Sequence, residues 1–271
     1  MCILPTNHIS KTMRNFILSL SLLLISLFLP ACLRAQQSET RDLPAFQSVR
    51  NGGSIKVTLQ KGDKPSARIE SEKIDLTEII TEVSDGELKI HFKPRLRVGW
   101  VEGQGAVRIL VTYQSLNGIR NAGSGSITCE GAIQNEEINI KQSGSGRINI
   151  AQVEAGKVLD ISVSGSGNVN ISKISTKKTL SAHISGSGSC EVAGGAVGVL
   201  EAGISGSGKL DILGVDAENA KVKVSGSGRM FVSVAESLQA RITGSGSVRY
   251  KTKPRSLEAD ISGSGRVRQI D

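Results

Sequence analysis

Apolar and polar residues alternate along most of the chain after residue 42. The alternation is clearest around short glycine-serine-glycine triplets, for example in Arg147-Ile148-Asn149-Ile150 after one triplet and Ile161-Ser162-Val163 before the next. A period of two is typical of β-strands with one buried face, whereas an amphipathic helix needs apolar residues at three- and four-residue spacing. The pattern therefore predicts an all-β protein.

The Gly-Ser-Gly triplet occurs eight times, and successive copies begin 21, 21, 21, 20, 20, 18 and 19 residues apart. A nearly constant period of this length indicates a repeat protein whose units stack on one another. We predict a single-domain parallel β-helix (a β-solenoid) of about eight coils, with each triplet at a sharp bend where side chains would obstruct the backbone. The predicted structural corners are Gly123, Gly125, Gly144, Gly146, Gly165, Gly167, Gly186, Gly188, Gly206, Gly208, Gly226, Gly228, Gly244, Gly246, Gly263 and Gly265.

Other glycine motifs fit the triplets poorly. Calcium-binding solenoid repeats need an aspartate at a fixed position after the glycines, and here Ser, Arg, Asn or Lys follows. A phosphate-binding loop needs a helix after the glycines, but strand-like sequence follows each triplet. We expect no metal and no cofactor.

The region before the repeats is also β-patterned but lacks the triplet period. We predict a domain over residues 42–268, in which 42–115 form an irregular β-rich cap and 116–268 form the repeats. The sequence predicts a helical turn over 76–80 and a hairpin at Asp85-Gly86. Residues 36–41 are expected to be a short polar lead.

Residues 1–35 resemble a secretory signal, because Lys11 and Arg14 precede an apolar run that ends near Pro30. Two processing routes remain open. Cleavage after Ala35 would release a soluble chain, whereas the lipobox-like sequence before Cys32 would end the signal at residue 31 and acylate that cysteine. We therefore expect export across the inner membrane, to the periplasm, the outer membrane or the cell surface, with membrane attachment only through this candidate lipid anchor.

Charge and cysteine content exclude several classes of protein. The formal charge of +8 falls to +5 without residues 1–35, and the basic residues are spread along the chain with few aromatic residues between them. This composition does not favour nucleic-acid binding. Cys129 and Cys190 lie three repeats apart, or about 14 Å along the stack, which is too far for a disulfide. We predict two free, buried thiols.

A loop over residues 93–105 contains the only tryptophan of the chain. Trp and Arg are enriched in binding hot spots, so Arg95, Arg97 and Trp100 form a candidate contact loop. The alternative is that Trp100 folds back onto the solenoid.

Catalytic candidates are few. Glu191 and Asp211 should lie on adjacent coils about 5 Å apart, which is the carboxylate separation of retaining glycosidases. The alternative is an ordinary solvated face. His91 and His183 are expected at the surface, and neither has the partners of a triad or a zinc site.

Several segments resemble a known family. They are Phe46–Val49, Gly53–Gly62 and Val83–Ile90, together with the Ser-Gly-Ser-Gly repeats. In these segments the chain resembles the family called putative auto-transporter adhesin, head GIN domain, over about residues 42–268. The resemblance implies an exported protein of the kind common in Bacteroidota, a parallel β-helix, and no assigned function.

These observations favour a non-enzymatic, adhesin-like module that binds an envelope protein or a surface polysaccharide through one face of the solenoid. The alternative is a structural envelope component that acts as a spacer or self-associates through its ends. A carbohydrate-active enzyme that uses Glu191 and Asp211 is the remote third hypothesis.

Overall fold

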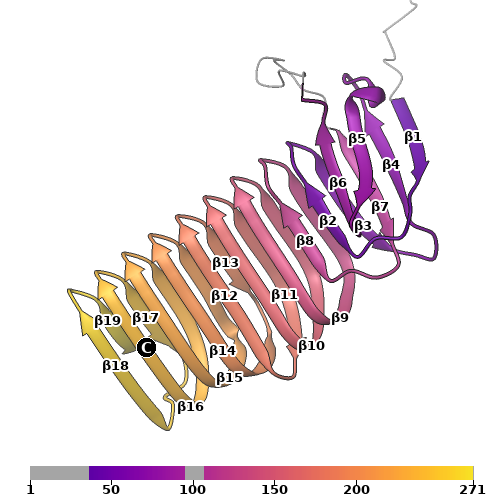
Figure 1. The fold of residues 1–271 in the computed structure, drawn as a ribbon. Helices are drawn as coiled ribbons and strands as arrows, with labels where there is room; N and C mark the ends of the chain where they lie inside the picture. Colours follow the sequence, from indigo (N-terminus) through magenta and orange to yellow (C-terminus); the bar gives the residue numbers. More distant parts are fainter. Residues whose placement is uncertain (1–36, 95–106, 271) are drawn as a thin grey trace, which may run out of the picture. The chain divides into compact units, whose positions relative to one another are not determined.

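A computed structural model describes residues 37–94 and 107–270 of the chain. The predicted signal segment, Cys32 and the candidate loop residues Arg95, Arg97 and Trp100 lie outside the described residues. The described residues belong to one compact unit, Gln36–Asp271. This unit is a parallel β-solenoid, which confirms the predicted all-β fold (Figure 1).

The strands fall into a cap and a repeat region. The cap contains β1 (Gln37–Asp42), β2 (Ser48–Asn51), β3 (Lys56–Lys61), β4 (Ser66–Ser71), the 3-10 turn η1 (Leu76–Glu78), β5 (Ile79–Ser84), β6 (Glu87–Phe92) and β7 (Arg108–Tyr113). The repeat region contains β8 (Gly118–Asn121), β9 (Ser126–Gly144), β10 (Arg147–Gly165), β11 (Asn168–Thr176), β12 (Thr179–Gly186), β13 (Ser189–Val192), β14 (Gly195–Gly206), β15 (Lys209–Gly226), β16 (Arg229–Gly244), β17 (Ser247–Tyr250), β18 (Ser256–Ser262) and β19 (Arg266–Gln269).

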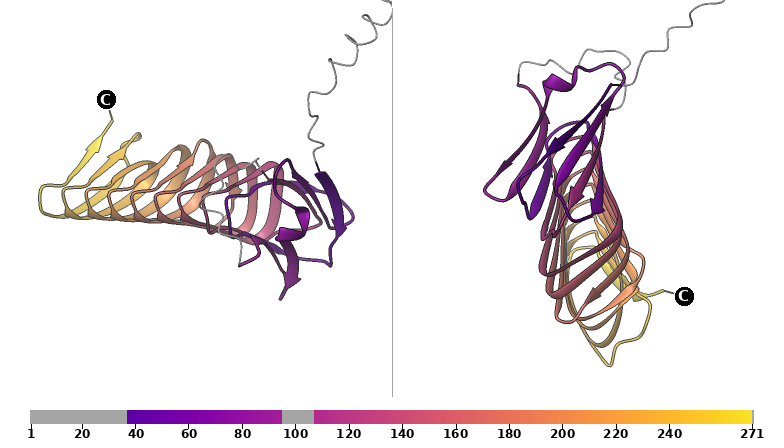
Figure 2. Two further views of the ribbon diagram at one scale, coloured as in Figure 1. Left: turned by 90° about the horizontal axis from the view of Figure 1, so that it is seen from above. Right: turned by 90° about the vertical axis from the view of Figure 1, so that its right-hand side faces the viewer.

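One coil of the solenoid can be followed along β15. Its residues 209–212 pair with 229–232 of β16, and its residues 219–226 pair with 237–244. The short segment between them, which bends at register shifts, forms a third side. We call the side that follows each triplet the post-corner face and the side that precedes each triplet the pre-corner face. Successive coils stack in parallel and in sequence order (Figure 2).

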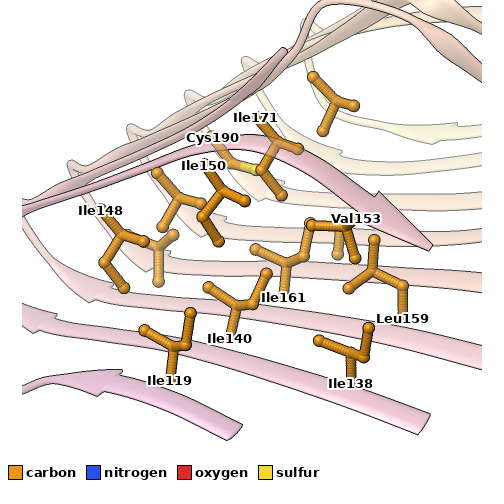
Figure 3. Close-up of a cluster of buried hydrophobic side chains, with 14 of the residues drawn as sticks. Ile119, Ile138, Ile140, Ile148, Ile150, Val153, Leu159, Ile161, Ile171 and Cys190 are labelled. Atoms are coloured by element: carbon orange, nitrogen blue, oxygen red, sulfur yellow. The ribbon is translucent and has the colours of Figure 1, made fainter. Parts of the chain in front are cut away.

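The core lies inside the coils and consists of inward-pointing aliphatic columns. On the post-corner face, Ile148, Cys190 and Met230 belong to one such column, and each is at most 1% exposed. Figure 3 shows isoleucine, leucine and valine side chains from successive coils meeting between the faces. Because burying an Ile or Leu side chain stabilises a fold by about 1.5–3 kcal/mol, these columns supply the main driving force for stacking.

The first glycine of the triplet occupies a position that other residues rarely adopt. From Gly144 to Gly263 these glycines have φ values between 96° and 118°. At Gly226, an added Cβ would lie 2.6 Å from the carbonyl oxygen of Gly206 on the previous coil. The same carbonyl accepts a hydrogen bond of 2.9 Å from the Ser227 amide. Both the backbone conformation and the close approach of the coils therefore require glycine.

A buried ladder of amide side chains supports the corners of the first coils. Asn51 donates to the carbonyl of Ile55 (2.9 Å) and to Asn121 Oδ1 (3.1 Å). Asn121 in turn donates to the carbonyl of Gly125 and to Gln142 Oε1, both at 2.9 Å. In later coils the same register position holds an aliphatic residue such as Val163. The amides satisfy polar groups that are buried at these corners.

The cap departs from the simple parallel stack. β4 is antiparallel to β7 and to β1, and β5 is antiparallel to β6 through the predicted hairpin, where Asp85 and Gly86 both have positive φ. The predicted helical turn is the short helix η1. Residues 37–41 of the predicted polar lead belong to β1, and this polar strand covers the free edge of β4.

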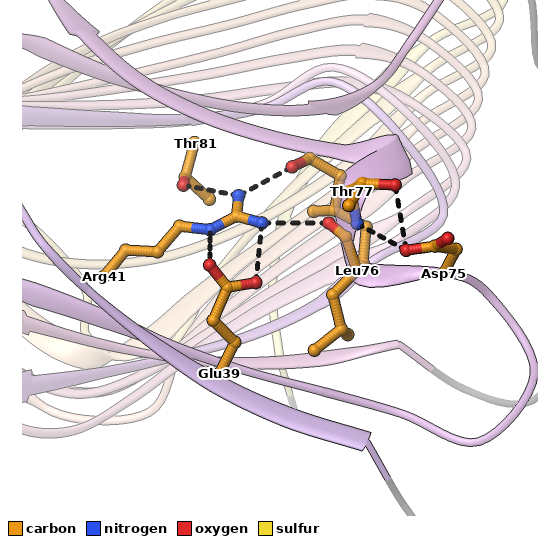
Figure 4. A network of polar contacts seen from close by, with 7 residues as sticks. Glu39, Arg41, Asp75, Leu76, Thr77 and Thr81 are labelled. Atoms are coloured by element: carbon orange, nitrogen blue, oxygen red, sulfur yellow. Dashed lines mark hydrogen bonds and ion pairs between the residues drawn. The ribbon is translucent and has the colours of Figure 1, made fainter.

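A charged network closes the N-terminal end of the core (Figure 4). Arg41 lies at an inward register position of β1, opposite the buried Ala67 of β4. Its guanidinium donates to the carbonyls of Leu76 (2.9 Å) and Ile79 (2.7 Å), and it pairs with Glu39 at 3.0 Å. Since Ile79 begins β5, this single side chain connects strands of the two faces across the end of the core. An inward charge at a sheet edge also disfavours pairing with another chain.

The other end of the stack has no comparable closure among the described residues. β18 pairs only with β16, and β19 pairs only with β17. By register, Leu257 and Ile261 continue the buried columns of Leu238 and Ile242, but they are 44% and 41% exposed. Among residues 37–94 and 107–270, no strand pairs with the outer edge of β18 or β19.

The corner geometry predicts a strong position-dependence of glycine substitutions. Gly226→Ala should destabilise the protein by about 2–4 kcal/mol, because it combines a positive φ with a clash against the previous coil. Gly131→Ala is the matched control, since an added Cβ there meets nothing within 4 Å. Urea unfolding followed by circular dichroism measures both, and an equal, small effect at the two positions would contradict this account.

Candidate binding face

The post-corner face of the last coils carries closely spaced basic side chains. Inward residues such as Leu210, Met230 and Val248 are fully buried, so the residues between them must point outward. We call the resulting group the basic ladder; it consists of Lys209, Arg229, Arg249, Arg266 and Arg268.

The strand register brings these side chains from separate repeats together. Lys209 pairs with Arg229, and Arg229 lies two coils from Arg266 with Ser247 between them. In the neighbouring column, Phe231 pairs with Arg249, which pairs with Arg268. Adjacent strands are about 4.8 Å apart, so the basic ladder forms one continuous patch.

Phe231 lies in the middle of the patch. The Lys209 Nζ atom is 5.3 Å from the centre of its ring, and the Arg249 Cζ atom is 5.7 Å from it. Both cations are within the range of a cation–π interaction, which holds them beside the partly exposed ring. Arg249 Nε is buried and has no hydrogen-bond partner among the described residues.

The patch has little compensating negative charge. Asp211 binds Lys209 at 2.9 Å, and this is the salt bridge of the patch. Arg229, Arg249, Arg266 and Arg268 form no salt bridge with any residue of the described ranges. Arg229, Arg266 and Arg268 are exposed and Arg249 is half-buried, and none of the four has a carboxylate partner among the described residues. This is a favourable arrangement for an anionic ligand.

The predicted carboxylate pair is brought together, but not in a catalytic setting. Glu191 and Asp211 are register partners on adjacent coils, as expected. Asp211 is held by Lys209 at 2.9 Å, and Glu191 is exposed on the flat face. Neither carboxyl lies in an enclosed cleft that could exclude water from a reaction.

His91 and His183 occupy separate surfaces. His183 points outward on the pre-corner face, where its Nδ1 atom would lie 2.6 Å from a Cβ added to Gly203 on the next coil. The imidazole thus covers the gap left by that glycine. His91 lies in the cap, where its Nδ1 is 2.9 Å from the carbonyl oxygen of Phe92. Residues 37–94 and 107–270 contain no group of three or more side chains that could hold a metal ion.

Cys129 and Cys190 are free and buried, which confirms the prediction. Burial raises the pKa of Cys190 to about 12, and the neighbouring Glu191 carboxylate adds to the increase. Burial also raises the pKa of Cys129, whose thiol lies 3.6 Å from the Tyr113 hydroxyl. Both thiols therefore pack as small apolar residues rather than as nucleophiles.

Sequence reasoning recognised the outward columns but did not identify the basic ladder as a site. The signal was present, because Lys209 and Arg229 follow their triplets directly and Phe231, Arg249 and Arg268 occupy the next outward position. It becomes a site only when the register places these positions side by side.

The fold and the repeated glycine corners define a parallel β-solenoid. The chain belongs to the family described as putative auto-transporter adhesin, head GIN domain, which matches residues 45–254. No match was found among the curated proteins. In the part of the chain that the structure describes, no helix is long and apolar enough to cross a membrane.

Solved structures share this fold at low sequence identity. A putative adhesin from Parabacteroides merdae aligns with a TM-score of 0.79 and 21% identity, covering 87% of this chain and 96% of that one. A putative adhesin from Parabacteroides distasonis aligns with a TM-score of 0.80 and 23% identity, covering 87% and 97%. A putative lipid binding protein from the same species aligns with a TM-score of 0.78 and 23% identity, covering 87% of this chain and 97% of that one. These likenesses establish the fold.

The buried thiols should resist modification. In a chain that begins at Gln36, Cys129 and Cys190 should not react with Ellman's reagent at pH 8 within the time in which a free thiol reacts fully. A pKa of about 12 at Cys190 leaves on the order of one thiolate in ten thousand at that pH. Both should react after unfolding in guanidinium. Rapid reaction of the native protein would contradict the described packing.

Proposed function

We propose that this protein is an exported, non-enzymatic binding module of the cell envelope, and that its basic ladder holds an acidic surface polysaccharide. The observation that carries the proposal is the group of unpaired guanidinium groups around Phe231. Membership of an adhesin family and the signal-like residues 1–35 support the envelope location.

The chemistry of the ladder suits a polymer with repeated acidic groups. Guanidinium groups bind carboxylates and phosphates through two parallel hydrogen bonds, which gives geometric specificity as well as charge. The ladder repeats along the stack at about 4.8 Å per coil, so an extended chain can contact several coils at once. Contacts that are individually weak then add through an increased effective concentration.

Phe231 adds an apolar surface to this charged patch. A pyranose ring has an apolar face of C–H groups, and an aromatic ring flanked by cations can pack against it while the arginines bind the acidic substituents. The guanidinium of Arg249 lies beside that ring, with its Cζ atom 5.7 Å from the ring centre. This combination favours an acidic sugar over a simple polyanion.

A binding role fits these residues better than hydrolysis does. A retaining glycosidase needs one carboxyl of the pair protonated and a site that distorts the sugar. The Glu191 and Asp211 carboxyls lie on an open face, and Asp211 is neutralised by Lys209. The proposal therefore assigns these acids no catalytic step.

The test is binding of the chain that begins at Gln36 to immobilised polygalacturonate, with dextran as the uncharged reference. Arg229→Ala/Arg249→Ala should weaken binding by about 150-fold or more, since each lost charged contact is worth roughly 1.5–3 kcal/mol. Phe231→Ala should weaken binding by about 5-fold or more.

The matched control is Lys221→Ala/Lys223→Ala, which removes the same charge from the exposed pre-corner face. It should change the affinity by less than about twofold, after allowance for general screening. An equal loss of affinity in the two double variants would show that binding depends only on the net charge of the protein. That result would overturn the proposed site. Binding to phosphatidylglycerol vesicles but not to polygalacturonate would replace the polysaccharide with an anionic lipid surface.

A further inference from the structure

The pre-corner face of the first coils carries four basic side chains in one line. Arg50 of β2 is the register partner of Lys89 of β6 on one side and of Arg120 of β8 on the other, and Arg120 is the partner of Lys141 of β9. The residue before each of them, such as Val49, is buried, so the four side chains point outward. We call these four residues the cation row. Figure 1 shows β2, β6 and β8 near the N-terminal end of the solenoid, away from the strands of the basic ladder.

The acids around the cation row do not neutralise it. Glu87 lies 4.0 Å from Arg120, and Glu82 of β5 ends the row as the register partner of Lys89. The other three cations form no salt bridge with any residue in the ranges 37–94 and 107–270. Like charges directly opposite one another on neighbouring strands destabilise a sheet. The free protein therefore carries an unfavourable repulsion here, which a bound anion would relieve.

Later coils show that the fold does not need cations in this column. By register, the column continues from Lys141 to Ser162, His183 and Gly203. These coils form the same parallel strands without a Lys or Arg at this position. The four adjacent cations are thus a local feature of the first coils rather than a requirement of the stack, and their mutual repulsion points to a ligand.

Two shallow hollows flank the cation row. One has a volume of about 380 Å³, borders Arg120 and Lys141, and includes Gly118 and Glu137 in its lining. The other has a volume of about 350 Å³ and borders the remaining two cations, beside the exposed Gly52. Among the described residues, the linings of both hollows contain no Phe, Tyr or Trp. A ligand can therefore reach the cations from both sides of the row, but it finds no aromatic platform there.

We propose that the cation row is a second binding site, which holds clustered phosphate groups borne by a polyphosphate chain or by lipid headgroups. Four cations at about 4.8 Å per strand span roughly 14 Å, so the row suits an anion with several charges within that length. Arginine binds phosphate oxygens through two parallel hydrogen bonds, and lysine binds them as a point charge. Without an aromatic ring to pack against a sugar, the row differs in its ligand from the basic ladder around Phe231.

The test is calorimetric titration of the chain that begins at Gln36 with linear tripolyphosphate, with flotation on phosphatidylglycerol vesicles as the second arm. Both arms use the Arg229→Ala/Arg249→Ala background, so that the basic ladder does not contribute. Adding Arg50→Gln/Lys141→Gln should weaken binding about tenfold or more, because two of the four charged contacts are lost. Binding of tripolyphosphate alone identifies a free polyphosphate as the ligand, and binding of the vesicles identifies lipid headgroups.

Thermal unfolding separates a binding role from a structural one. Arg50→Gln/Lys141→Gln should raise the melting temperature at low salt by about 1–4 °C, because the repulsion between adjacent cations is reduced. If these cations instead supported the fold, their replacement would lower the melting temperature as well as the affinity, and the inference would fail.

The matched control is Lys221→Gln/Lys223→Gln, which removes the same charge from a later coil of the same face. Lys223 lies four strands from Lys141 in the same column, or roughly 19 Å, which exceeds the Debye length of about 8 Å. The control should therefore change the affinity by less than about twofold.

Two further results would overturn the inference. They are an absence of binding to both phosphate probes in the Arg229→Ala/Arg249→Ala background, and an equal loss of affinity in the control. The proposed function is tested with polygalacturonate, whose binding should survive Arg50→Gln/Lys141→Gln. Either proposal can therefore fail without the other.

Discussion

The close approach of successive coils at the glycine corners is the constraint on which the rest of this structure depends. The carbonyl of one corner glycine lies where a side chain of the next would be, as Gly206 and Gly226 show. Only this approach allows the strands before and after each corner to hydrogen-bond continuously to their neighbours. The aliphatic columns then stack without gaps, and the outward columns acquire a fixed spacing. The basic ladder follows from that register.

Much of this architecture could be predicted from the sequence, because the information is local and repeated. Alternation such as Arg147-Ile148-Asn149-Ile150 gives the strands and their buried side, and the triplet period gives the stacking. The cap was less predictable, since its antiparallel pairs join segments such as β1 and β4 whose order in space no short pattern determines. The buried amide ladder of Asn51 and Asn121 was also missed, because a polar residue in a β-pattern normally indicates a solvated position.

The candidate site was only partly predictable for the same reason. Each basic residue of the ladder stands in an outward column that the sequence reveals, but the contact between Phe231 and Arg249 depends on which coils are neighbours. Glu191 and Asp211 were correctly predicted to lie side by side on adjacent coils. The salt bridge from Lys209 neutralises Asp211, so this acid is a surface residue rather than a catalytic candidate. The loop with Arg95, Arg97 and Trp100 lies outside the described residues, and its contact role stays a prediction.

The most direct measurement of the central claim is an NMR titration of the chain that begins at Gln36 with a short acidic oligosaccharide such as trigalacturonate. Arginine Nε and phenylalanine ring signals report on the site itself. We expect saturable chemical-shift changes for the signals of Arg229, Phe231 and Arg249. The signals of Lys221 and Lys223 on the pre-corner face should not shift. Shifts centred on the pre-corner face, or none at the ladder at saturating ligand, would contradict the claim that this face of the solenoid is where it binds.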